Sequence, residues 1–124
     1  MRGLRGKAII VTGAASGIGR AAAERLAEEG AVVGIFDLNA EGAERAAGSI
    51  RQSGLKAAAY AVDITDYAAV AKAVAAFEEA AGPIEGLVNN AGWDKAGPFV
   101  RSNPADWKKI VDINLYGPLN MTHV

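Results

Sequence analysis

The fold is decided by one stretch of the chain, Lys7-Ala8-Ile9-Ile10-Val11-Thr12-Gly13-Ala14-Ala15-Ser16-Gly17-Ile18-Gly19. The run up to Val11 is short, rich in β-branched residues and apolar on both faces, which is typical of a strand covered on both sides in a parallel sheet. The three glycines that follow predict a tight turn. A helix should come next, because Ile18, Ala22 and Leu26 recur at helical spacing, and Gly30 should end it.

Each glycine of the turn has a separate physical purpose. Gly13 permits the sharp bend, Gly17 lets the main chain approach a ligand, and Gly19 lets the helix and strand pack closely. Backbone N–H groups at the helix N-terminus would stabilise an anion there, by about 0.3–1 kcal/mol at an exposed site. We expect a pyrophosphate, although a glycine-rich turn alone fits a purely structural bend equally well.

An acidic residue supplies the second signal. The next apolar run, residues 31–36, predicts a second strand and ends at Asp37, eighteen residues after Gly19. A carboxylate at this place, about 20 residues past the turn, can accept the hydroxyl groups of a dinucleotide's adenosine ribose. Because the same carboxylate would repel a 2′-phosphate, Asp37 predicts a preference for NAD over NADP.

Strands and helices should alternate along the rest of the chain. Thr65 is the expected N-cap of the third helix, and Asn103 caps the last one, with Pro104 at its first position. The expected elements are helix 40–52, strand 56–62, a helix from Thr65 to Gly82, strand 84–88 and a helix from Pro104 onward. Strict alternation predicts a parallel sheet with right-handed crossovers, whose strand ends meet at one ligand crevice.

Composition excludes several other classes of protein. The 124 residues suffice for one domain, and thirteen basic against fourteen acidic residues leave no basic face for nucleic acid or a membrane surface. The absence of cysteine excludes disulfides and thiolate metal sites. We expect no metal, because the only histidine, His123, lacks ligand partners nearby and fits a surface or packing position. No apolar run is long enough to span a bilayer and no signal peptide is evident, so we expect a cytoplasmic protein.

The TGxxxGIG form of the turn and the sequence Asn89-Asn90-Ala91-Gly92 after the fourth strand resemble the short-chain dehydrogenase/reductase family. The resemblance implies a Rossmann-like, doubly wound parallel sheet with its first four strands in the order 3-2-1-4. It also implies a role for each motif: the turn holds the pyrophosphate, Asp37 takes the ribose, and the Asp-Ile pair takes the adenine. The implied cofactor-binding residues are Gly13, Ser16, Gly17, Ile18, Gly19, Asp37, Asp63, Ile64, Asn90, Ala91 and Gly92.

Asn114 resembles the asparagine of the family's catalytic tetrad, whose main-chain carbonyl holds a water that relays protons. Pro118 supports this role, because it lacks the N–H that would bond the Asn114 carbonyl in a regular helix. The alternative is a kinked helix with an asparagine satisfied inside the fold. Trp93, after the Asn-Asn-Ala-Gly motif, is either a substrate wall or a cover for the pocket edge. The Trp93-Asp94 pair, together with Pro98-Phe99 beyond it, resembles family members that act on cyclic hydroxyacyl thioesters.

The sequence departs from the family pattern in lacking the catalytic Tyr-x-x-x-Lys, since Tyr60, Tyr67 and Tyr116 have no lysine four residues later. We therefore expect residues 1–124 to be an incomplete dinucleotide-binding domain, inactive alone. It would be the cofactor half of an NAD-dependent oxidoreductase that moves a hydride between nicotinamide and a small secondary alcohol or ketone. The full-length enzyme would form homo-oligomers, as family members usually do. A non-catalytic, redox-sensing module complete at 124 residues and a purely structural scaffold remain alternatives.

Overall fold

Four parallel strands form one sheet in the order β3-β2-β1-β4, which confirms the predicted topology. The computed structural model describes residues 2–124. The strands are β1 (Ala8–Thr12), β2 (Val32–Asp37), β3 (Lys56–Ala61) and β4 (Ile84–Val88). From β1 the chain adds β2 and β3 on one side and then crosses back to add β4 on the other side of β1. A crevice is therefore expected at the carboxyl ends of β1 and β4, where the strand order reverses.

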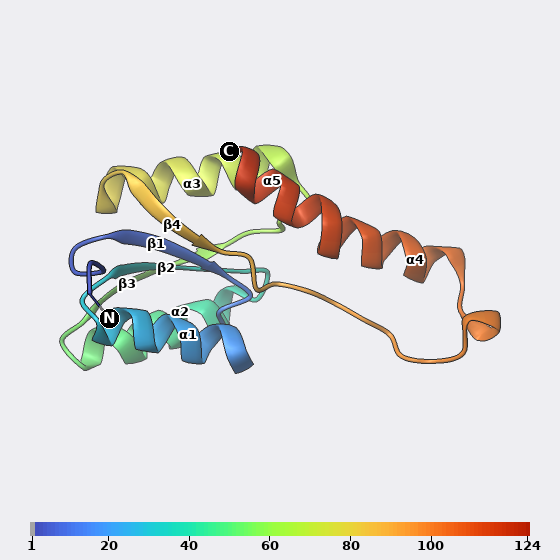
Figure 1. Ribbon diagram of the computed structural model, residues 1–124, viewed down its shortest axis with the longest axis horizontal. Helices are drawn as coiled ribbons and strands as arrows, with labels where there is room; N and C mark the ends of the chain where they lie inside the picture. Colours follow the sequence, from blue (N-terminus) through green and yellow to red (C-terminus); the bar gives the residue numbers. More distant parts are fainter. Residues whose placement is uncertain (1) are drawn as a thin grey trace.

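Helices cover the sheet on both faces (Figure 1). α1 (Gly17–Glu28) and α2 (Ala40–Gln52) lie on one face, and α3 (Tyr67–Ala81) and α5 (Gly117–His123) lie on the other. α4 (Pro104–Val111) follows a long connection that leaves β4 and carries the short helix η1 (Phe99–Arg101). The result is a three-layer α/β/α arrangement, as the Rossmann-like assignment requires.

Two apolar cores lie on the two faces of the sheet. On the α1 and α2 face, the core is built largely from alanine, valine and isoleucine. On the other face, Phe36, Tyr60 and Phe77 pack with ring centroids 5.2 to 6.3 Å apart. Gly34 makes room for this cluster, because a Cβ there would lie 3.0 Å from the Phe77 ring. Small residues therefore bring α1 and α2 close to the sheet, whereas aromatic rings fill the space beneath α3.

The buried face of α1 differs from the one predicted. Gly19, Ala23 and Ala27 are buried, whereas Ile18 is 83% exposed. The prediction followed the largest apolar side chains, but the small residues decide the packing because they let α1 lie close to β1. The expected end of α1 is confirmed, since Gly30 follows the C-cap with a φ of 94°.

The third helix begins one residue later than predicted. Its N-cap is Asp66, whose carboxylate accepts the Ala69 N–H at 3.1 Å. Thr65 does not cap the helix, because its hydroxyl donates to Asp63 Oδ1 at 2.7 Å instead. The Asn103 cap is confirmed, since its side chain accepts the Asp106 N–H.

The last predicted helix is interrupted by a wider turn. Between α4 and α5, η2 (Asp112–Tyr116) is π-helical, and the Gly117 N–H bonds the Asp112 carbonyl five residues earlier. Pro118 explains the interruption, since its ring would clash with the carbonyl four residues before it in a regular α-helix. The wider turn removes that clash and displaces the helix face by one residue.

Candidate functional site

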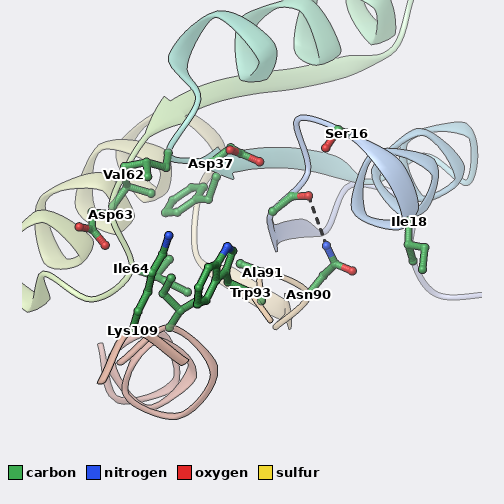
Figure 2. A pocket seen from close by; sticks show the side chains of 15 residues that line it. Ser16, Ile18, Asp37, Val62, Asp63, Ile64, Asn90, Ala91, Trp93 and Lys109 are labelled. Atoms are coloured by element: carbon green, nitrogen blue, oxygen red, sulfur yellow. Dashed lines mark hydrogen bonds between the residues drawn. The ribbon is translucent and has the colours of Figure 1, made fainter. Parts of the chain in front are cut away.

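A cavity of about 490 Å³ lies at the carboxyl edge of the sheet (Figure 2). Its volume falls within the usual range of small-molecule sites. It is lined by Gly13, Ser16, Ile18, Phe36, Asp37, Leu38, Val62, Asp63, Ile64, Asn90, Ala91, Gly92, Trp93, Lys109 and Ile113. The structure thus brings together the segments that follow the four strands, which were expected to meet at this edge. The last helical segment contributes Lys109 and Ile113 as well.

A buried threonine joins the ends of β1 and β4 below the cavity. Thr12, only 1% exposed, accepts the N–H groups of Asn90 and Ala91, each at 3.0 Å, on its hydroxyl oxygen. In return, the Asn90 amide donates to the main-chain carbonyls of Thr12, at 3.1 Å, and Gly13, at 3.3 Å. The motif after β4 is therefore fixed against the glycine-rich turn by reciprocal hydrogen bonds, the last of which is drawn in Figure 2.

The three glycines of the turn occupy different environments. A Cβ on Gly13 would lie 2.8 Å from Ala91 Cα, and one on Gly19 would overlap the Asn90 amide and the Gly13 carbonyl. These two positions require glycine for close packing. Gly17 has open space around it and a φ of 58°. Neither Gly17 nor Gly19 lines the cavity, whereas Ser16 and Ile18 do.

Asp37 extends from the end of β2 into the cavity. Its Oδ2 accepts the Ala15 N–H at 3.0 Å and its Oδ1 accepts the Asn39 N–H at 2.9 Å. Each oxygen has a second lone pair, so the carboxylate can accept two further hydrogen bonds. The glycine-rich turn therefore fixes the orientation of Asp37 and leaves it able to bind a pair of hydroxyl groups.

The Asp63-Ile64 pair forms another wall. Asp63 Oδ1 accepts both the N–H and the hydroxyl of Thr65. Ile64 is 8% exposed and packs so tightly on Gly117 that a Cβ on that glycine would overlap it. The Asn120 amide donates to the Ile64 carbonyl at 2.9 Å. α5 therefore holds this part of the cavity in place.

The side chain of Asn114, on η2, is hydrogen-bonded to the main chain that follows the Asn-Asn-Ala-Gly motif. Its Oδ1 accepts the Trp93 N–H at 2.9 Å and its Nδ2 donates to the Trp93 carbonyl at 2.7 Å. The side chain thus fixes the loop at the cavity edge, and the π-helical turn places it there. The proton-relay role of its main-chain carbonyl stays a prediction.

Sequence reasoning did not include several lining residues, namely Phe36, Leu38, Val62, Lys109 and Ile113, and it left the role of Trp93 open. Lys109 Nζ lies 3.9 Å from the centroid of the Trp93 ring. The four-residue spacing of Lys109 and Ile113 indicates that they share a face of the helical segment. The sequence gives no sign, however, that this segment leans over the cavity.

Other candidate sites are few within the described part of the chain. His123 Nδ1 lies 2.9 Å from the Tyr67 hydroxyl on the surface, which agrees with a packing position. Residues 2–124 contain no group of three or more potential metal ligands. Over the same residues, every helix is too short or too polar to cross a lipid bilayer.

Residues 7–124 match the family described as short chain dehydrogenase. Together with the four-stranded Rossmann-like sheet and the cavity at its edge, this match shows that the chain belongs to the short-chain dehydrogenase family. The assignment confirms the resemblance inferred from the glycine-rich turn and the Asn-Asn-Ala-Gly motif.

Several proteins of similar sequence are named as dehydrogenases. The chain is 43% identical over 111 residues to 2,5-dichloro-2,5-cyclohexadiene-1,4-diol dehydrogenase of Sphingobium indicum, covering 90% of this chain and 44% of the relative. It is 36% identical over 119 residues to 2,3-dihydro-2,3-dihydroxybenzoate dehydrogenase of Bacillus subtilis, covering 96% and 46%. The solved structure of NAD⁺-bound xylitol dehydrogenase superposes with a TM-score of 0.93 at 36% identity, covering 98% and 47%. The chain therefore spans about half the length of the relatives it matches.

Proposed function

We propose that this chain binds a nicotinamide dinucleotide, NAD in preference to NADP, in the cavity at the carboxyl edge of its sheet. The observation that carries the proposal is the Asp37 carboxylate, which faces the cavity and is held by backbone N–H groups from the glycine-rich turn and from the start of α2. A fixed carboxylate favours two ribose hydroxyls and disfavours a phosphate in their place.

Each wall of the cavity has a part in binding. The turn from Gly13 to Gly19 receives the pyrophosphate at the N-terminus of α1, where the helix dipole and backbone donors favour negative charge. Asp63 and Ile64 receive the adenine, and the Asn90-Ala91-Gly92 segment lines the remainder of the cofactor. The hydrogen bonds between Thr12 and Asn90 keep these walls at a fixed separation. A bound nicotinamide dinucleotide supplies hydride transfer.

The activity that this cofactor serves is oxidoreduction of a small secondary alcohol or ketone. Two relatives are named as dehydrogenases of hydroxylated ring compounds, which supports an alcohol substrate and leaves a cyclic hydroxyacyl thioester as a candidate. Asn114 would hold the proton-relay water through its carbonyl. The catalytic Tyr-x-x-x-Lys is absent from these 124 residues, so they would be inactive without a further part of the enzyme. We further propose that the full-length protein is cytoplasmic and homo-oligomeric.

One alternative is a non-catalytic dinucleotide-binding module that senses redox state. The two proposals differ in turnover by the protein as its natural source produces it. Hydride transfer to or from NAD with an alcohol or ketone would support the enzyme. NAD binding without turnover by that product would support the module.

Substitution of Asp37 tests the assignment of the ribose site. Hydrogen bonds to a charged group contribute about 1.5–3 kcal/mol, so Asp37→Ala should weaken NADH binding by about tenfold or more. The affinity for NADPH should not fall, because a repulsive charge is also removed. Both dissociation constants can be measured by titration of the dinucleotide's fluorescence.

A second carboxylate provides the control. Glu41→Ala removes the same charge from α2, four residues along the chain, where the side chain is exposed and lies outside the cavity. It should leave both dissociation constants unchanged. An NADH to NADPH affinity ratio that is the same in Asp37→Ala and in the unmodified chain would contradict the proposal. Failure of the unmodified chain to bind either dinucleotide would favour a purely structural scaffold.

A further inference from the structure

Three charged side chains line the cavity, namely those of Asp37, Asp63 and Lys109. Two carboxylates against one ammonium leave an excess negative charge around a space that is proposed to receive an anionic ligand. The pyrophosphate of a dinucleotide carries two negative charges, so both carboxylates disfavour it by Coulomb repulsion. Lys109 is the only cationic side chain among the lining residues that can offset this repulsion.

The ion pairing on α4 singles out the same lysine. Lys108, its neighbour, pairs with Asp112, and Lys95 pairs with Asp106 at the start of the helix. Among residues 2–124, Lys109 takes part in no ion pair. Its ammonium instead lies over the ring of Trp93, 3.9 Å from the centroid. The charge of Lys109 is thus held in place without being neutralised by a carboxylate.

Trp93 is itself fixed, because Asn114 bonds its main-chain N–H and carbonyl. Figure 2 shows Lys109 and Trp93 side by side at the cavity, with Asp63 on one side and Asn90 on the other. A cation–π contact at an exposed site is weaker than a hydrogen bond between an ammonium and a phosphate. The indole therefore keeps the ammonium within the cavity but does not hold it against a competing anion.

We propose that Lys109 determines the affinity for the phosphates of the dinucleotide, by supplying the positive charge that offsets Asp37 and Asp63. Trp93 acts as a positioning residue, since it keeps the ammonium at the cavity when no ligand is bound. This inference rests on the proposed function. It assigns a binding role to a residue outside the glycine-rich, acidic and Asn-Asn-Ala-Gly motifs.

The test compares a phosphate-bearing ligand with one that lacks phosphate. Lys109→Met removes the charge while keeping an unbranched side chain beside Trp93. It should weaken NADH binding by about tenfold at low ionic strength. Adenosine, which has the same base and ribose but no phosphate, should bind equally well to the variant and to the unmodified chain. NADH affinity can be measured by fluorescence titration and adenosine affinity by ligand-observed NMR.

Two further variants and a salt series complete the design. Lys108→Met removes a charge from the adjacent position, outside the cavity, and should leave NADH affinity unchanged. Lys109→Arg should retain NADH affinity, because arginine keeps the charge and also stacks on aromatic rings. Between about 20 and about 300 mM salt, NADH affinity should fall more steeply for the unmodified chain than for Lys109→Met.

Two results would overturn the inference. One is NADH affinity in Lys109→Met equal to that of Lys108→Met. The other is an equal loss of NADH and adenosine affinity, which would mean that Lys109 only packs against the adenosine. If the unmodified chain binds neither NADH nor adenosine, the proposed function itself is refuted. That outcome can be distinguished from failure of the Lys109 inference, because it is measured on the unmodified chain before any variant is made.

Discussion

Replacing Thr12 by valine should destabilise the protein at the junction of β1 and β4. The two side chains have nearly the same shape, so the change creates no cavity and removes only the hydroxyl. That hydroxyl accepts the N–H groups of Asn90 and Ala91 at 3.0 Å. It also lies 3.4 Å from the Val88 carbonyl, to which it donates. Because Thr12 is 1% exposed, water does not take the place of the lost oxygen without disturbing the turn.

The magnitude follows from the Ala91 N–H, which loses its acceptor, whereas the Asn90 N–H keeps a second acceptor in the Val88 carbonyl at 3.0 Å. A buried N–H left without a partner costs about 1–3 kcal/mol, and the Asn90 amide still holds the turn through its bonds to main-chain carbonyls. We therefore expect Thr12→Val to lower the free energy of unfolding by about 1–3 kcal/mol. This is a large part of the roughly 5–15 kcal/mol typical of a domain.

Urea unfolding followed by circular dichroism measures this change. With a slope of about 2 kcal/mol per molar urea, the transition midpoint should fall by about 0.5–1.5 M. Thr12→Ser is the control, since it keeps the hydroxyl and loses one methyl group, at a cost of about 1 kcal/mol. A loss smaller for valine than for serine would refute the reasoning, because it would show that the methyl group of Thr12 matters more than its hydrogen bonds.

Two further predictions concern packing and pH. Gly19→Ala should lower the free energy of unfolding by about 2–3 kcal/mol, because the new Cβ overlaps Asn90 and the Gly13 carbonyl. The control is Gly48→Ala, at an open position within α2, which should be neutral or stabilising in the same urea assay. Burial raises the pKa of Tyr60 above its ordinary value of 10.0. The unfolded chain thus loses this proton first, and the stability that depends on it is complete below about pH 10 and declines as the pH rises through the raised pKa. Tyr60→Phe should therefore lose less unfolding free energy than the unmodified protein when the pH is raised above about 10. An equal loss in the two proteins would exclude Tyr60 as the source of the alkaline destabilisation.

Local signals allowed much of the fold to be predicted from the sequence. The bounds of α2 and β4 agree with the expected ranges 40–52 and 84–88. In α2, the Asn39 side chain accepts the Gly42 N–H at 3.0 Å, and Gly54 follows the helix with a φ of 78°. Such caps depend on residues a few positions apart, so the sequence reports them directly. The parallel strand order likewise follows from strict alternation and the family resemblance.

Features that depend on distant contacts were harder to predict. Ile18 has the side chain expected of a core residue, yet Gly19 takes the buried position because α1 must approach Asn90, far along the chain. No sequence motif indicated Lys109 as a site residue, because its place at the cavity depends on the position of α4 relative to the sheet. Thr65 and Asp66 are both good caps, and the choice between them depends on the bond from Thr65 to Asp63. For Ile18 and Lys109 a tertiary contact decided the outcome, whereas the Thr65 bond to Asp63, two residues away, is a local competitor for the cap.

The π-helical turn at Asp112–Tyr116 restricts how this segment can change in evolution. Each residue of a helix advances the direction of its side chain by about 100°. The turn absorbs one extra residue, so that Ile113 lines the cavity while Met121 lies in the core. Deleting one residue would restore a regular α-helix, in which the Pro118 ring again meets the carbonyl four residues before it. The neighbouring loop at 94–98 runs over the surface and carries no such constraint. Insertions and deletions among relatives should therefore accumulate in that loop and be rare in the turn.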